Sequence, residues 1–96
     1  MVDIFLIVIK TNKLQEQFEF YTQLGFLFEY HKHGNGPYHY ASTGSKPVLE
    51  IYPLPKGITE ADNTTRLGFT VENLDALIDK LMFAGIKIIS APAKTA

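Results

Sequence analysis

The sequence predicts a small α+β domain made of two copies of one strand–helix–strand unit, the second of them incomplete. Short β-branched apolar segments alternate with segments whose apolar residues recur at helical spacing. In each unit an asparagine precedes the helical segment and a glycine follows it, as helix caps do. The units align sixty residues apart, so that Leu14 matches Leu74 and Leu24-Gly25-Phe26 matches Ala84-Gly85-Ile86. The alternative is a chance occurrence of two such units, but two true copies can bury each other's apolar faces.

The composition fixes the broad class of protein. With 96 residues the chain has room for one domain and one core, and its 46% hydrophobic content excludes a disordered tail. The lack of cysteine excludes disulfides, thiolate metal sites and cysteine nucleophiles. A net charge of −1 with scattered lysines argues against a nucleic-acid partner. The apolar run 4–9 is too short to span a bilayer and has no signal-peptide flanks, so we expect a cytoplasmic protein without a membrane partner.

The first half of the chain, called module one (1–54), is expected to contain one helix and four strands. Asn12 is predicted to cap the helix, with Gln15 at the capping-box position, and Gly25 to end it in a left-handed conformation. Residues 34–36 (GNG) predict a turn, because glycine and asparagine tolerate positive φ. The predicted strands are residues 4–10, 26–33, 37–43 and 48–54.

The second half repeats this plan only in part. The predicted organisation is one domain (1–96), with a polar linker (55–65) before an incomplete module two (66–96). Module two is expected to hold strands at 66–71 and 86–90, around a helix that Asn73 caps and Gly85 ends. Since no further hairpin follows, we expect either a truncated chain or a sheet that another molecule completes. Open sheet edges favour a homodimer. In one form of this hypothesis the two copies exchange structural elements.

Four segments in order carry a resemblance to a known family. The predicted helix with Phe20-Tyr21 ends in Leu24-Gly25-Phe26. The segment LEIYP at 49–53 resembles the closing strand of a first module, and LGFTVENLDAL at 67–77 resembles the opening of a second module. In these motifs the chain resembles the glyoxalase/bleomycin resistance protein/extradiol dioxygenase superfamily, also called the vicinal oxygen chelate superfamily. The resemblance implies paired βαβββ modules whose sheets form a cup around a ligand. Members isomerise or cleave small molecules at a divalent metal, or sequester drugs; the family's last hairpin, with its final carboxylate, is missing here.

Strand parity predicts which side chains face such a cup, because neighbours along a strand point to opposite faces. The predicted cup-facing residues are Leu6, Val8, Lys10, Val48, Glu50, Tyr52, Arg66, Gly68 and Thr70. The resemblance implies metal ligands at the positions of Leu6, Arg66 and Glu50. Only Glu50 fits, since Leu6 has no donor atom and Arg66 is a permanent cation. We therefore expect no complete metal site at these positions, and we assign no catalytic residue.

A ligand site is predicted instead on the cup face. Its expected members are Arg66, Glu50, Tyr52, Tyr40 and Lys10. In this hypothesis Arg66 binds a carboxylate or phosphate through two parallel hydrogen bonds, and the tyrosines supply ring surface with a polar tip. The alternative is that Arg66 and Glu50 only pair with each other across the sheet.

The three histidines form a second candidate group. His31 and His33 alternate on one predicted strand and therefore share a face, and His39 lies across the turn. Together with Glu50 they are candidate metal ligands or an acid–base cluster. The alternative is that they are solvated side chains beside an exposed turn.

Three functions follow from these observations. The first is a metal-free, bleomycin-resistance-like protein that binds a small, anionic molecule. The second is a metal-dependent enzyme, a glyoxalase-like lyase or isomerase or a dioxygenase-like oxygenase, whose divalent metal is held by Glu50 with histidines or by a partner chain. The third is a ferredoxin-like interaction module without a pocket, which the strand–helix–strand repeat also permits. Fold alone does not choose among them.

Overall fold

A computed structural model describes residues 1–90 of the protein. The chain divides into two compact units, Met1–Arg66 and Leu67–Ala96. Among residues 1–90 no helix has the length and apolar character that crossing a membrane requires.

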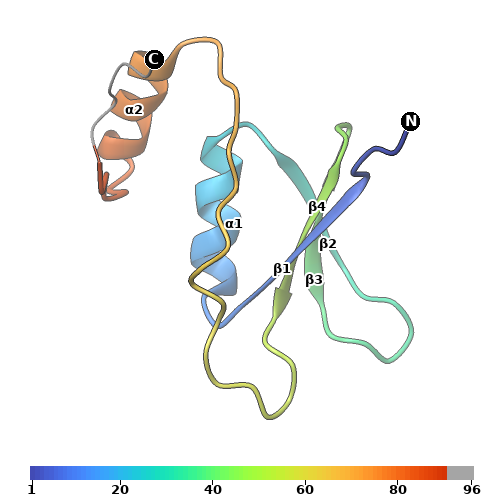
Figure 1. Cartoon of the computed structure of the whole chain (residues 1–96). Coiled ribbons are helices and arrows are strands. Elements are labelled where there is room, and N and C mark those ends of the chain that lie inside the picture. Colours follow the sequence, from blue (N-terminus) through green and yellow to red (C-terminus); the bar gives the residue numbers. More distant parts are fainter. Residues whose placement is uncertain (91–96) are drawn as a thin grey trace. The chain divides into compact units, whose positions relative to one another are not determined.

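The first unit contains a helix and a four-stranded sheet (Figure 1). Its elements are β1 (Leu6–Thr11), α1 (Leu14–Gln23), β2 (Leu27–His31), β3 (His39–Thr43) and β4 (Val48–Pro53). The strand order is β1-β4-β3-β2, with β1 parallel to β4 and the other neighbours antiparallel. This is one βαβββ module, and it confirms the predicted α+β class and the order of elements in the first half.

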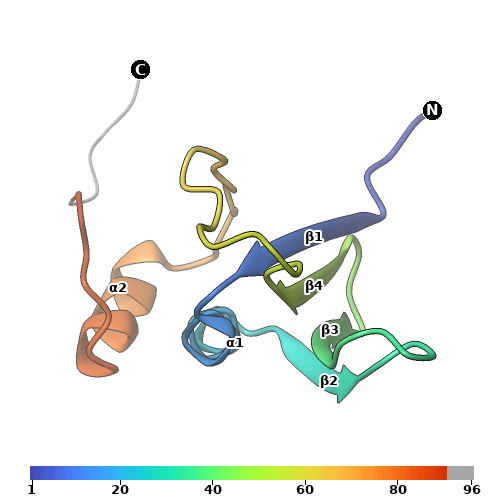
Figure 2. The same ribbon diagram turned by 90° about the horizontal axis from the view of Figure 1, so that it is seen from below.

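The core lies between α1 and one face of this sheet (Figure 2). Burial alternates along β1 and β4, as strand parity requires, and leaves Leu49 and Ile51 2% and 0% exposed. Phe18 of α1 stacks on Tyr40 of β3, with ring centroids 4.1 Å apart, and contacts Phe28 of β2. These contacts identify the face with Ile51 and Tyr40 as the helix side, because the two residues are register partners.

One predicted cap of α1 is right and the other is wrong. Gly25 takes a φ of 106° just after the helix, as predicted. Asn12 does not cap: Lys13 occupies the N-cap position, and no side chain there accepts a helix N–H. The hydroxyl of Thr11 accepts the Lys13 backbone N–H instead, at 2.9 Å. Gln15 makes no capping-box contact, because its side chain bonds to Glu19 and Tyr40.

The second unit holds α2 (Leu74–Phe83). The side chain of Asn73 accepts the Ala76 N–H at 3.0 Å, and Gly85 has a φ of 82°, which confirms both predicted ends. The strands predicted at 66–71 and 86–90 are wrong: neither segment pairs with a strand within the described residues. Apolar, β-branched sequence favours extended backbone, but a strand also needs a neighbour to hydrogen-bond with.

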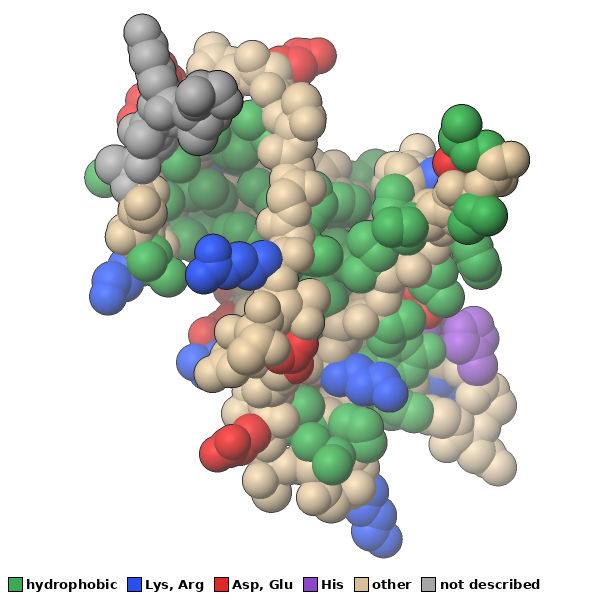
Figure 3. All heavy atoms as spheres, in the orientation of Figure 1, with side chains coloured by type: hydrophobic (Ala, Val, Ile, Leu, Met, Phe, Trp, Pro, Cys, Tyr) green, Lys and Arg blue, Asp and Glu red, His purple; other side chains and the backbone are tan. Residues whose placement is uncertain are grey.

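Apolar side chains are exposed at the start of the first unit. Ile4 and Phe5 are 70% and 72% exposed, and Leu6 and Val8 of β1 are also exposed. In Figure 3, which has the orientation of Figure 1, hydrophobic side chains are visible on the surface at the N-terminal end of the chain. Since β1 is an edge strand, its outer backbone groups have no sheet partner within the described chain.

Candidate ligand groove and histidine cluster

The sheet face opposite α1 gathers most of the predicted site residues. In the parallel pair of β1 and β4, Val8 lies beside Glu50 and Lys10 lies beside Tyr52. The buried core residues Leu49 and Ile51 alternate with Glu50 and Tyr52 along β4, so these two side chains point away from α1. Parity therefore places Lys10, Glu50 and Tyr52 on one face, which will be called the open face.

A groove of about 590 Å³ lies at one end of the open face. Its lining residues are Val8, Lys10, Pro37, Tyr52, Pro53, Leu54, Pro55 and Lys56. The walls are mainly apolar, and the two charged side chains are both cationic. Burial and, to a lesser extent, the nearby Glu50 carboxylate raise the pKa of the Tyr52 hydroxyl.

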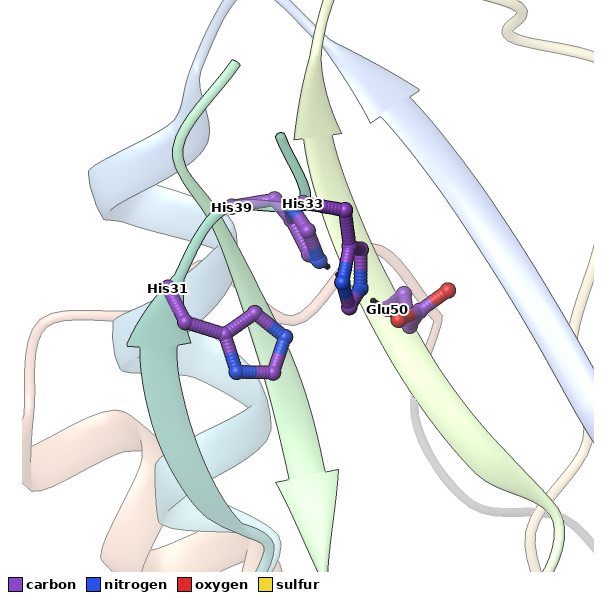
Figure 4. A group of neighbouring side chains, drawn as sticks. All are labelled: His31, His33, His39 and Glu50. Atoms are coloured by element: carbon purple, nitrogen blue, oxygen red, sulfur yellow. Dashed lines mark ion pairs between the residues drawn. The ribbon is translucent and has the colours of Figure 1, made fainter. Parts of the chain in front are cut away.

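Beside the groove the three histidines and Glu50 come together (Figure 4). His31 at the end of β2 lies directly across from His39 at the start of β3, and His33 follows two residues after His31. Glu50 approaches from the next strand, β4. One ligand atom from each of the four side chains lies within 4.8 Å of the others. The centroids of the three imidazole rings are 4.7–5.1 Å apart. This group will be called the histidine cluster.

His39 is the most constrained member of the histidine cluster. Its side chain is fully buried, and its Nδ1 bonds to the carbonyl oxygen of Pro37 at 3.2 Å. Its Nε2 lies 3.5 Å from the Glu50 carboxylate and makes no hydrogen bond. At His31, Nδ1 lies 3.7 Å from the Glu29 carboxylate, which is beyond hydrogen-bond distance, and Nε2 is buried without a hydrogen-bond partner.

Two predicted ligand residues lie elsewhere. Tyr40 faces the helix side, where its ring stacks on Phe18 and its hydroxyl donates to the Gln15 side chain at 3.0 Å. Arg66 is exposed, lies in no strand and does not line the groove. No ion pair joins it to Glu50 in the part of the chain that the structure describes, and Glu50 faces His39 instead.

The groove also uses residues that sequence reasoning did not select. Pro37 comes from the loop before β3, and Leu54, Pro55 and Lys56 follow β4. Pro37 and Leu54 stand at the ends of the predicted strands 37–43 and 48–54 and were assigned to no face, and Pro55 and Lys56 belong to the predicted linker. The one available signal was the apolar run 53–55, which overlaps the end of the predicted strand 48–54.

Comparison with known proteins agrees with the observed βαβββ unit. A search of solved structures finds an integron cassette protein from the mobile metagenome of V. cholerae, with a TM-score of 0.66 and 16% sequence identity. The match covers 99% of this chain and 77% of that chain, and it shows a shared fold. No curated protein matches the sequence significantly. The family model for the Glyoxalase/Bleomycin resistance protein/Dioxygenase superfamily matches residues 4–96, so the chain belongs to that superfamily.

Proposed function

We propose that this protein binds a small, anionic molecule with an apolar or aromatic body in the groove of the open face. The observation that carries the proposal is the composition of that groove: apolar walls, the Tyr52 ring and two lysines with no acidic side chain among the lining residues. Pockets for small molecules are mostly apolar with a few well-placed polar groups, and this groove has that character.

The charges around the groove favour a negatively charged ligand. Lys10 lies beside Tyr52 in the strand register and both line the groove, so an ammonium and a phenol hydroxyl are available on the same wall. An anionic group can accept hydrogen bonds from both donors, and bonds to a charged group are stronger than neutral ones. The Glu50 carboxylate, on the same face of the sheet, faces His39 and is not part of the groove lining.

The groove also helps to choose among the alternative functions. A pocketless ferredoxin-like interaction module would have no use for such a hollow, so this function is disfavoured. A metal-dependent lyase, isomerase or oxygenase is the second candidate, and the histidine cluster with Glu50 is the observation that favours it (Figure 4). A ligand role for Arg66 and residence in the cytoplasm stay predictions from the sequence.

A homodimer is part of the same proposal. The open edge of β1 and the exposed Ile4 and Phe5 beside it form a surface that a second copy can cover. Two identical copies would use the same patch on both sides, as twofold dimers do.

A matched pair of probes tests the ligand class. Calorimetric titration with 2-naphthoate and with its neutral analogue 2-naphthamide isolates the effect of the negative charge. We expect the native chain to bind naphthoate about tenfold more tightly, which corresponds to roughly 1.4 kcal/mol for one charge-assisted contact. Lys10→Met should remove this preference, and Lys13→Met, at an exposed lysine outside the groove, should keep it. Equal affinity of the native chain for both probes, or a preference that Lys10→Met preserves, would contradict the proposal.

A further inference from the structure

We propose that His31, His33, His39 and Glu50 form a binding site for a divalent transition metal, with Zn²⁺ as the ion whose preferences they fit best. This donor set shares only Glu50 with the positions Leu6, Arg66 and Glu50, where the superfamily resemblance implies a metal and where two of the three side chains do not fit. The inference depends on the histidine cluster and not on the ligand groove, so each can fail without the other.

Three of the four donors come from neighbouring strands of one sheet, and the fourth, His33, lies just beyond the end of β2. His31 and His39 are register partners across the β2–β3 pair, and His33 extends from the end of β2 toward the turn. Ala41, two residues after His39 on β3, is the register partner of Glu50, which places the carboxylate on the same face one strand further on. His31, His39 and Glu50 are therefore positioned by the backbone ladder, whereas His33 is carried by the connection that follows β2.

The state of His39 points to a cation at its Nε2. The carbonyl of Pro37 can only accept a hydrogen bond, so Nδ1 carries a proton, and Nε2 of the neutral ring therefore presents a lone pair. That lone pair lies 3.5 Å from an oxygen of Glu50, which also has only lone pairs to offer when ionised. Two facing acceptors repel each other unless a positively charged species lies between them.

The separation of these two atoms discriminates between a proton and a metal. A proton shared by an imidazolium and a carboxylate gives a bond of about 2.7–2.9 Å, whereas Nε2 of His39 is 3.5 Å away and makes no hydrogen bond. Two ligand atoms on a tetrahedral zinc ion, each about 2.0–2.1 Å from the metal, lie about 3.3 Å apart. The His39–Glu50 pair is therefore spaced as two ligands of one ion.

The surroundings of the cluster support the same assignment. Metal-bound histidines commonly donate their other ring N–H to a carbonyl or a carboxylate, which fixes the ring orientation. Pro37 has this position for His39, and Glu29 lies at the corresponding nitrogen of His31 at 3.7 Å. In both rings the remaining Nε2 is buried and has no hydrogen-bond partner, so it is free to bind a metal.

The cluster needs a modest contraction to close around an ion. The ligand atoms lie within 4.8 Å of one another, so the widest pair must approach by roughly 1.5 Å to reach tetrahedral spacing. His33 can supply such a movement, because it is exposed and lies beyond the end of β2. Four protein donors fill a tetrahedral shell, which is typical of a structural zinc site. Bound zinc would then tie the β2–β3 hairpin to β4 and stabilise the fold.

The composition of the chain allows a clean test. The sequence has three histidines, all in the cluster, and no cysteine, so zinc binding by an untagged full-length chain is reported by these imidazoles alone. We expect calorimetry to give one Zn²⁺ per chain, nitrogen NMR to show shifts of all three imidazoles, and the thermal unfolding midpoint to rise with zinc. Mg²⁺, which prefers oxygen donors, should produce none of these effects.

Variants separate this site from adventitious binding. Glu50→Gln keeps the shape of the side chain and should lose most of the zinc affinity, as should His31→Gln, which spares the buried His39. Glu60→Gln, at an exposed carboxylate outside the cluster, is the matched control and should bind zinc as the native chain does. The inference is overturned by a native chain that binds no stoichiometric zinc, by shifts confined to His33, or by a Glu50→Gln variant with native affinity.

Discussion

The ring of His39 lies flat against the ring of Tyr52, with centroids 3.9 Å apart and planes inclined by 9°. Tyr52 also lines the groove, and so does Pro37, whose carbonyl accepts the His39 hydrogen bond. Two residues of the groove, Tyr52 and Pro37, therefore contact His39 of the histidine cluster. A ligand in the groove and an ion in the cluster would both be next to the His39–Tyr52 stack.

Removal of the Tyr52 ring should affect both features. Tyr52→Ala should weaken zinc binding, because the buried His39 loses the ring that holds it in place, and should also weaken naphthoate binding in the groove. Tyr52→Phe keeps the stack, so calorimetry should give near-native zinc affinity and a naphthoate affinity reduced only by the lost hydroxyl. If Tyr52→Ala binds zinc as the native protein does, the stack does not support the cluster.

Glu29 provides a test of the surroundings of the metal. Its carboxylate lies near Nδ1 of His31 without itself belonging to the cluster. Glu29→Gln should lower zinc affinity by about 10–100-fold, the usual effect of losing a group that orients a metal ligand. Naphthoate affinity should stay unchanged, because Glu29 does not line the groove. Native zinc affinity in this variant would mean that His31 needs no such support.

The exposed start of the first unit predicts self-association. Size-exclusion chromatography with light scattering should give the mass of a dimer. Phe5→Ser should shift this equilibrium toward the monomer, because it removes a large apolar side chain that is 72% exposed. Ile58→Ser, at an exposed residue of the segment after β4, is the control. A native protein that runs as a monomer at all accessible concentrations would contradict the homodimer.

The helix caps give a matched pair of stability predictions. Asn73→Ala removes a side chain that accepts a helix N–H and should cost about 1 kcal/mol locally, which corresponds to about fivefold faster amide exchange in α2. Asn12→Ala should leave exchange in α1 almost unchanged, because Asn12 makes no cap contact. Equal effects of the two substitutions would show that the caps are wrongly assigned.

The sequence predicted those parts of the fold that depend on local rules. Parity and glycine stops identified the five elements of the first unit, because its strands find partners within the same module. The segments 66–71 and 86–90 have similar local character but no ladder partner within the described residues, and no local pattern reveals such a lack. The choice of Asn12 failed because the adjacent Thr11 offers a competing hydroxyl one residue earlier.

For the site too, the sequence predicted what local rules determine and missed what tertiary contacts determine. Parity placed Lys10, Glu50 and Tyr52 on one face, as the strand register has them. Tyr40 was selected for its chemistry without a parity argument, and its pairing with Ile51 turns it to the helix side. The spacing of His31 and His33 indicated a shared face, but the approach of Glu50 to His39 depends on β4 lying beside β3. That strand order is a tertiary property.

Intermolecular NOEs between 2-naphthoate and the native protein test most directly whether the open face is the binding face. The naphthyl protons should give NOEs to the methyl groups of Val8 and to the ring of Tyr52, and none to Phe18 or Tyr40 on the helix side. NOEs to the helix-side rings alone, or to neither set under saturating probe, would contradict the account.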